Sequence, residues 1–454
     1  MKLASVLCAL LTAPLTFLRA HFSNPAKTIF IFLDWDGCTN SMYDASHMTV
    51  LKGTLTQLNL LYKECSYDND NFRYDFSTIH PEPITLPCQG TSYLGGLPYD
   101  FNSQCCGGSP SDIDMLFSSV QKQVDISKHN YVHFLNLPYI ESNGPPGYAC
   151  RSSGKAVGGL LQSGQGVLMI PNIQLSVPKG GGDDPTFIYR AALFDSLFHE
   201  TGHMMSLNHA YSRAHEYGDW SSPMGVGNGM LCHIAPHSFA LGWSTPVVTL
   251  QVTPNDRWTD FQIPILTKSS VNQVLIKLPN SNHVLYVSVR SKTGNPNVDQ
   301  QLTKKVRGVE STYTDFEQKV VVHSWERVRN YENRGTYISV DNKLTLVIAT
   351  VSRGDTFDFA QKAQWWDASV GFDPQGTYAF TYPTPEKIAI KHTSFTPGVG
   401  STVSICFYTT SASACSEGFA NPVVSHPTLN VARGKNADGG SAGIQYYTSF
   451  VSSW

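Results

Sequence analysis

The chain has 454 residues, which is enough for two or three domains at the usual size of about 150 residues each. Its formal net charge is −3 and only 15% of its residues are charged, so the composition does not indicate a nucleic-acid partner or an anionic membrane surface. Hydrophobic residues make up 41% of the chain, an ample supply for globular cores.

The first 20 residues have the pattern of a secretory signal peptide. They open with Lys2, continue through an apolar run and end on Ala20, where we expect cleavage. The alternative is a membrane anchor, but Arg19 closes the run early and no later segment reaches about 18 apolar residues. We therefore predict a secreted, extracellular protein with no membrane span in the mature chain.

The cysteines fit an oxidising compartment. Removal of the signal peptide takes Cys8 with it and leaves nine of the 10 cysteines, most of which should pair. Cys406 and Cys415 are close to each other and isolated from the rest, so we predict that they form one disulfide. Seven cysteines remain in the first half, which leaves one thiol without a partner. No zinc-finger spacing is present.

The first predicted elements are a strand and a helix. Residues 28–33 (TIFIFL) are apolar, β-branched and aromatic, as in a buried strand. Residues 34–37 (DWDG) predict a turn, in which we interpret the two carboxylates as turn residues rather than cation ligands. A helix is predicted over residues 46–64, where Leu51, Leu55, Leu58 and Tyr62 recur on one face.

The next stretch combines loops with a second helix. Residues 66–108 are polar and contain Pro, Gly and Cys, so we interpret them as disulfide-tied loops. Ser109 and Pro110 predict the start of a helix, as N-cap and first residue, and its apolar stripe extends to Val124. Strands are predicted at 131–137 and 166–170, with loops between them.

A Gly-rich run precedes the longest predicted helix. Residues 179–185 (KGGGDDP) indicate a flexible linker, and a lid or a calcium loop is the alternative. Asp184 can cap the following helix and Pro185 can start it, so the helix should extend to about Met205. Aromatic side chains would bury the back of this helix.

The strongest chemical signal lies in this helix. His199 and His203 are four residues apart, so they lie on one face of the helix and can bind one zinc ion together. Glu200 projects from the next position and can act as general base on a zinc-bound water. His209 supplies a third nitrogen if the chain doubles back after the helix. The competing interpretation is a buried helix with satisfied histidines, although a chance HExxH is expected only about 0.01 times in a chain of this composition.

Three stretches carry a resemblance to a known family. They are HETGHMMSLNHA (199–210), EYGDWSSPMG (216–225) and APHSFALGW (235–243). Together they resemble the gametolysin (autolysin) family of secreted zinc peptidases, within the metzincins. The resemblance implies that His199, His203 and His209 are zinc ligands, that Glu200 is the catalytic base and that Met224 forms the apolar floor of a Met-turn. It also implies an upper sheet-and-helix subdomain above an irregular lower one.

One position departs from the metzincin pattern. Ser206 stands where that pattern has a glycine, which turns the backbone sharply out of the helix. A non-glycine residue in such a conformation costs about 1–3 kcal/mol, which zinc binding can offset. One alternative for the third ligand stays open, a gluzincin-type Glu216. The other histidines of this region, His215, His233 and His237, are not at the required spacing, so we interpret them as structural or exposed.

After Trp243 the sequence changes to short alternating segments between turns. They predict an all-β, sandwich-like domain over residues 245–408. The predicted strands are 274–278, 284–290, 320–323, 336–340, 344–351, 387–391 and 402–408, with hairpins at 279–282 and 341–342. The segments LYVSVR (285–290), KVVVH (319–323) and RGDTF (353–357) also resemble the region after the catalytic domain of gametolysin-like proteins. Residues 409–454 lack periodicity and are predicted to be an irregular tail.

These inferences combine into one hypothesis. We expect an α+β chain with a signal peptide (1–20), a metzincin-like catalytic domain (21–244) and the all-β domain. The expected function is a secreted zinc endopeptidase that acts through Glu200 and a zinc-bound water. The resemblance implies matrix or cell-wall proteins and glycoproteins as substrates. We expect one Zn²⁺, no supported Ca²⁺ site, no nucleic-acid partner and a monomer. The alternative is a secreted zinc-binding adhesion or structural protein without peptidase activity.

Overall fold

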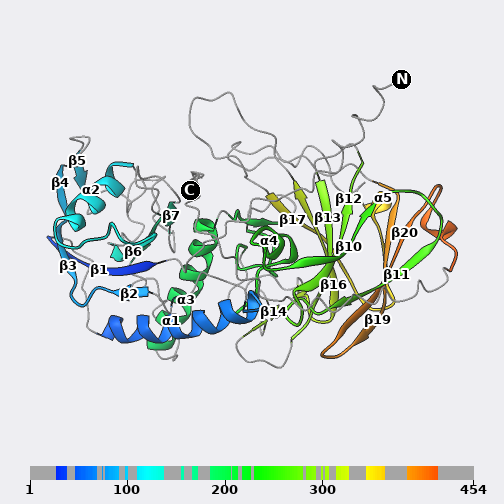
Figure 1. The fold of residues 1–454 in the computed structure, drawn as a ribbon, viewed down its shortest axis with the longest axis horizontal. Helices are drawn as coiled ribbons and strands as arrows, with labels where there is room; N and C mark the ends of the chain where they lie inside the picture. Colours follow the sequence, from blue (N-terminus) through cyan, green and yellow to red (C-terminus); the bar gives the residue numbers. More distant parts are fainter. Residues whose placement is uncertain are drawn as a thin grey trace, which may run out of the picture.

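The fold was analysed in a computed structural model of the chain, and it has two parts that lie side by side (Figure 1). One part is a sheet with helices, and the other is built almost entirely of strands. The structure describes residues 27–37, 46–68, 74, 77–91, 98–100, 110–137, 155–157, 166–171, 185–205, 207–212, 217–225, 230–279, 283–292, 298–299, 302–305, 313–326, 344–362 and 386–417.

The first part is organised around a mostly parallel sheet with the order β2-β1-β6-β8-β7, in which β3 also pairs with β1. Its strands are β1 (Thr28–Asp36), β2 (Ser77–Ile79), β3 (Ile84–Pro87), β6 (Tyr131–Leu137), β7 (Lys155–Val157) and β8 (Gly166–Pro171). Only β7 is antiparallel to its neighbour. The central strand β1 is apolar on both faces because helices cover both sides of the sheet.

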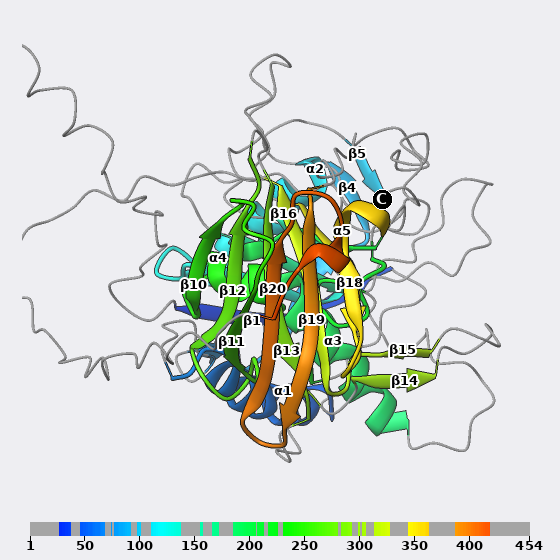
Figure 2. The ribbon, with the colours of Figure 1, turned by 90° about the vertical axis from the view of Figure 1, so that its right-hand side faces the viewer.

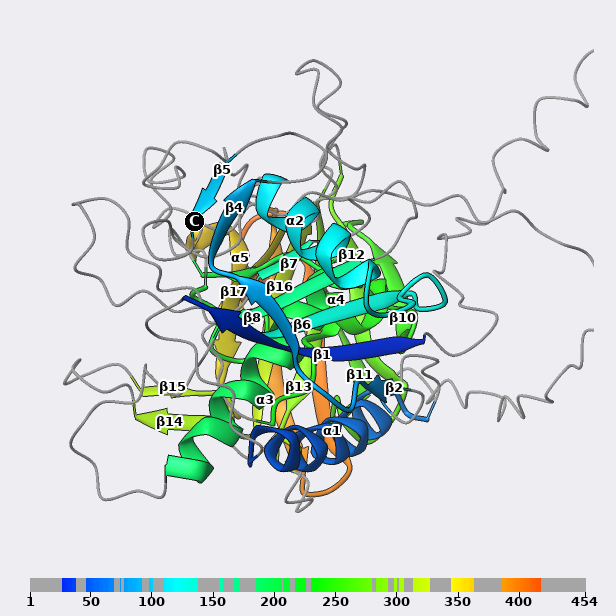
Figure 3. The ribbon, with the colours of Figure 1, turned by 90° about the vertical axis from the view of Figure 1, so that its left-hand side faces the viewer.

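The helices divide between the two faces (Figure 3). On one face lies α2 (Pro110–Gln121), whose Leu116 and Phe117 pack in one buried cluster with the sheet. On the other face lie α1 (Ser46–Cys65) and α3 (Pro185–Met204). α3 is the predicted histidine-bearing helix, and it begins at Pro185 as expected.

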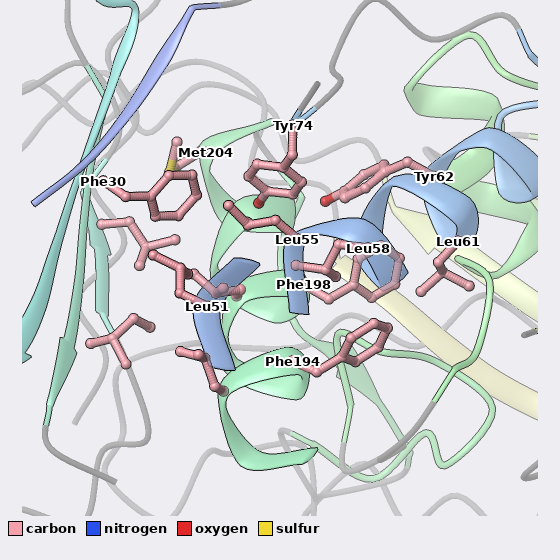
Figure 4. Close-up of a cluster of buried hydrophobic side chains, with 14 of the residues drawn as sticks. Phe30, Leu51, Leu55, Leu58, Leu61, Tyr62, Tyr74, Phe194, Phe198 and Met204 are labelled. Carbon is pink, nitrogen blue, oxygen red and sulfur yellow. The ribbon is translucent and has the colours of Figure 1, made fainter. Parts of the chain in front are cut away.

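A shared apolar cluster holds α3 against α1 and the sheet (Figure 4). The predicted face of α1 is buried as expected, including Leu51, Leu55, Leu58 and Tyr62. From α3, Phe194 and Phe198 enter the same cluster and leave the opposite side of the helix for the histidines. Burial of each such side chain contributes about 1.5–3 kcal/mol, so the helix that carries the candidate ligands is fixed by packing.

Three loop predictions were wrong. Residues 34–36, predicted as a turn, continue β1 because they pair with β3, and only Gly37 has the positive φ of a turn. Residues 66–108, predicted as loops, contain β2 and β3 and the small pair β4 (Gln89–Thr91) and β5 (Pro98–Asp100). Residues 155–157, predicted as loop, form the edge strand β7. Such short segments become strands because a sheet edge pairs with them, not through periodicity of their own.

The second part consists of two facing sheets (Figure 2). The first has the order β10-β12-β13-β16-β17-β9, and the second has the order β11-β20-β19-β18. Their strands are β9 (Ala210–Tyr211), β10 (Thr245–Gln251), β11 (Trp258–Pro264), β12 (Val271–Lys277), β13 (His283–Arg290), β16 (Lys319–Glu326), β17 (Leu344–Val351), β18 (Thr356–Asp358), β19 (Ile388–Thr396) and β20 (Gly400–Phe407). Side chains from both sheets form one buried apolar cluster between them.

Most strands of this part follow the prediction. The segments predicted at 284–290 and 344–351 are β13 and β17. β12 and β13, on either side of the hairpin predicted at 279–282, pair antiparallel, while residues 280–282 themselves lie outside the described residues. Sequence analysis missed β10 and β11, whose exposed sides carry few apolar residues. The strand predicted at 336–340 and the hairpin at 341–342 lie outside the described residues.

The remaining short elements are α4 (Ala235–Ala240), α5 (Phe359–Lys362) and the pair β14 (Thr303–Lys305) and β15 (Tyr313–Asp315). α4 lies within residues 235–243, the third stretch that carries the family resemblance. Among the helices that the structure describes, none combines the length and apolar character needed to cross a bilayer.

Disulfides tie both parts of the molecule. Cys406 pairs with Cys415, as predicted. Cys65, the last residue of α1, pairs with Cys232, which is 167 positions further along the chain. This second bond joins α1 to the segment that follows the metal site.

Candidate metal centre

The centre begins at the C-terminal end of α3. This helix carries His199, Glu200 and His203, and it ends at Met204. The Leu207 amide donates to the Gly202 carbonyl, a bond that closes the last helical turn. The chain then turns back, so that His209 faces the two helical histidines. Ser206 lies outside the described residues, so its departure from the metzincin pattern is not tested.

The three histidines converge on one point. His203 Nε2 lies 3.1 Å from His199 Nε2 and 2.9 Å from His209 Nε2. Zn–N bonds of 2.0–2.1 Å in tetrahedral geometry separate ligand nitrogens by about 3.3 Å, within a few tenths of an ångström of these values. Among the described residues, this is the only group of three or more potential metal ligands that converges in this way.

Backbone carbonyls orient two of the rings. His199 Nδ1 lies 2.8 Å from the Pro223 carbonyl oxygen, and His203 Nδ1 lies 2.8 Å from that of Leu207. Each Nδ1 therefore donates its proton to a carbonyl, which leaves Nε2 with its lone pair toward the centre. This tautomer is the one that a metal-binding histidine requires.

The surroundings also keep two of the ligands, His203 and His209, in the neutral form. Burial lowers the pKa of His203 well below its usual value, and the neighbouring His209 and His199 lower it further. The pKa of His209 falls well below normal for the same reasons, burial first and His199 next. Neutral imidazoles bind a cation without first losing a proton, so the donor set fits a divalent metal.

Met224 lies against the helix at Gly202. It is fully buried, and a Cβ atom placed on Gly202 would lie 2.3 Å from its sulfur. Glycine at position 202 therefore lets the methionine approach the helix directly. A second close approach occurs at Gly225, where a Cβ atom would lie 2.1 Å from the Asp219 carbonyl oxygen. The loop of residues 217–225 is thus tightly packed under the histidines.

Two further side chains border the centre. The ring of Tyr217 lies beside His209, with the ring centroids 4.0 Å apart. Glu200 is 6% exposed and follows His199 directly on α3. Glu216, the alternative ligand, and His215 lie outside the described residues.

Sequence analysis missed several buried polar residues around the centre. His233 and His237 are buried, and they are not among the histidines whose ligand atoms converge. The missed residues are Arg290 and His323, which lie on strands β13 and β16 of the second part. A charged or ionisable residue inside an otherwise apolar strand was the only available signal, because the partners of these residues, apart from Asp299, lie 58 to 104 positions away in the sequence.

The centre defines the class of the protein: a helix with two metal-binding histidines, a returning third histidine and an adjacent glutamate make it a metallopeptidase of the HExxH type. The gametolysin peptidase M11 family model matches residues 38–358, more than half of the chain, and the chain belongs to this family. No curated protein and no solved structure matched the chain in the corresponding searches.

Proposed function

We propose that this protein is a secreted zinc endopeptidase in which His199, His203 and His209 hold the metal and Glu200 is the general base. The convergence of three imidazoles, with Glu200 on the same helix, is the observation that supports this proposal most directly. Three protein ligands leave a coordination position open, which is typical of catalytic rather than structural zinc sites.

The residues of the chain have distinct roles in this proposal. Zinc, when bound, polarises a peptide carbonyl and makes water a nucleophile near neutral pH. Glu200 takes up the proton of the attacking water at its carboxylate and passes it to the leaving amine. The carbonyls of Pro223 and Leu207 keep His199 and His203 in the metal-binding tautomer throughout. Met224 supplies an apolar floor, which shapes the site beneath the metal ligands and does not compete with them for the metal.

The finer organisation is part of the same proposal. We assign residues 1–20 to a signal peptide, 21–244 to a metzincin-type catalytic domain, 245–408 to a β-sandwich domain and 409–454 to a tail. The disulfides and the cysteine content support an extracellular location. Membership of the family supports protein substrates, and we propose extracellular matrix or cell-wall proteins and glycoproteins.

The replacement Glu200→Gln tests the catalytic role. It keeps the size of the side chain but removes the base, so we expect zinc content to stay near one ion per chain while cleavage of casein falls by about 100-fold or more. The matched control is Glu82→Gln, which alters an exposed glutamate in the first part of the molecule and should leave both values unchanged.

Chelation separates the proposed function from its alternative. Removal of the metal should abolish cleavage, and added Zn²⁺ should restore it. A wild-type protein that binds zinc but cleaves neither casein nor a peptide library would instead support the non-enzymatic zinc-binding protein. Unchanged cleavage by the Glu200→Gln variant would exclude Glu200 as the base.

A further inference from the structure

The second part of the molecule holds the segment that completes the metal centre. β9 follows His209 directly. It pairs in parallel with β17, in the six-stranded sheet of the second part, and Ala210 is the partner of Thr345. The third ligand therefore comes from a segment whose backbone is part of that sheet. The two ligands on α3, in contrast, are fixed by the helix and its apolar cluster.

The same segment is bonded to the loop under the histidines. The Ala210 amide donates to the Met224 carbonyl at 2.8 Å, and the Asp219 amide donates to the Ala210 carbonyl at 3.1 Å. Ala210, the residue directly after the third ligand, is thus hydrogen-bonded near both ends of the 217–225 loop. Pro223, within this loop, carries the carbonyl that orients His199. The position of the loop consequently affects two of the three ligands.

Asp219 anchors this loop to strand β16. One carboxylate oxygen accepts from the amide and the hydroxyl of Ser221, at 2.9 and 2.6 Å. The other lies 3.0 Å from Nε2 of His323, and both side chains of this pair are fully buried. Burial by itself would raise the pKa of Asp219, but the hydrogen bonds from His323 and Ser221 lower it below its usual value. Because a buried carboxylate is costly without hydrogen-bond donors, loss of His323 or Ser221 as a donor should destabilise this position of Asp219.

Arg290 on β13 makes a second, independent attachment. Its Nη2 donates to the Ser221 carbonyl at 3.0 Å and to Asp299 at 2.9 Å, and its Nη1 donates to the Cys232 carbonyl at 3.2 Å. Arg290 and Asp299 are fully buried. Two neighbouring strands of one sheet thus hold the loop at Asp219 and at Ser221, only two residues apart.

We propose that His323 is a positioning residue for the metal centre: it holds Asp219 and thereby sets the loop that orients His199 and carries Met224. The strands of the second part are then a structural component of the metal centre. This inference rests on the proposed zinc site, because it concerns the affinity of that site. A partner that fixes the orientation of a metal ligand changes affinity by about 10–100-fold when it is removed.

The test compares two buried histidines in the full-length protein. In His323→Leu, we expect Zn²⁺ affinity, measured by competition with a chromophoric chelator, to fall by about 10–100-fold, and the visible spectrum of the Co²⁺-substituted protein to change. The control is His392→Leu. His392 is equally buried on β19, where it bonds to Ser401 and to the Val351 carbonyl in the other sheet. This control should lower thermal stability and leave both metal readouts unchanged.

A conservative variant keeps the test decisive if His323→Leu does not fold. In His323→Gln the amide can donate to Asp219 in place of Nε2, so most of the affinity and the wild-type Co²⁺ spectrum should return. Wild-type affinity in folded His323→Leu, equal affinity losses in the His392→Leu control, or no recovery in a folded His323→Gln protein would each overturn the inference. A wild-type protein that binds no Zn²⁺ would overturn the proposed function itself, which distinguishes the two failures.

Discussion

The contact between Gly202 and Met224 gives the sharpest test of how the floor of the centre is built. The replacement Gly202→Ala adds one Cβ atom, which would lie 2.3 Å from Met224 Sδ, 3.1 Å from its Cε and 3.5 Å from His233 Cε1. Met224 is fully buried, so its side chain can make room for the added atom only by shifting within packed surroundings.

Two opposing effects set the magnitude. Overpacking of a buried site costs about 1–3 kcal/mol. Alanine is favoured over glycine within a helix by about 1 kcal/mol. The difference between these effects leaves a net cost, so we expect Gly202→Ala to lower the free energy of unfolding by up to about 2 kcal/mol.

A double-mutant cycle isolates the contact. Met224→Ala alone should cost about 2–5 kcal/mol because it leaves a cavity under the helix. In this background the added Cβ atom meets no sulfur, so Gly202→Ala should become neutral or stabilising by up to about 1 kcal/mol. Urea denaturation of the four proteins in the presence of a chelator measures these free energies without a contribution from metal binding.

Two results would contradict this reasoning. No loss of stability from Gly202→Ala in the wild-type background would mean that Met224 does not fill the space under the helix. Alternatively, an equal cost in both backgrounds would place the clash elsewhere. The Gly53→Ala variant is the control, because a Cβ atom there meets nothing within 4 Å and only the helix preference of alanine should remain.

Two further predictions concern stability. Burial lowers the pKa of His133 to about 3 from a usual value of 6.5, so between these values the unfolded chain binds a proton that the folded chain does not. The free energy of unfolding should fall by about 1.4 kcal/mol per pH unit as the pH drops through this window, and His133→Leu should remove that part of the slope in urea denaturation at stepwise pH. Loss of the Cys65–Cys232 bond, which spans 167 positions, should cost about 5 kcal/mol by chain entropy, against about 3 kcal/mol for Cys406–Cys415, which spans 9. Paired Cys→Ala variants measure this difference, and equal losses would contradict the chain-entropy reasoning.

The candidate site was unusually accessible to sequence reasoning because its chemistry is local. His199 and His203 are four residues apart, and helix geometry alone places them on one face. His209 is only six residues further, so a single reversal of the chain brings it back. The core face of α1 and the strands of the second part followed from periodicity in the same way. Each of these features is encoded within a short window of sequence.

The failures have a common physical cause. Residues 34–36 and 155–157 became strands only because β3 and β8 offered them unpaired backbone groups. The partners of Arg290 and His323 lie in the 217–225 loop and at residues 232 and 299, and no local pattern signals such contacts. A short sequence window carries no information about which distant backbone edge or buried charge it will meet.

The sequence by itself determined the metal-ligand set, the helix that presents it, and the division into a helical and a strand-rich half. Helical periodicity and alternation are properties of neighbouring residues, so they can be read before the chain folds. The tertiary structure alone decided how the centre is supported, since β9 joins a sheet that begins more than thirty residues later and buried polar side chains from that sheet hold the loop under the histidines. Those contacts arise from burial, where a polar group must find whichever partner the folded chain brings within reach.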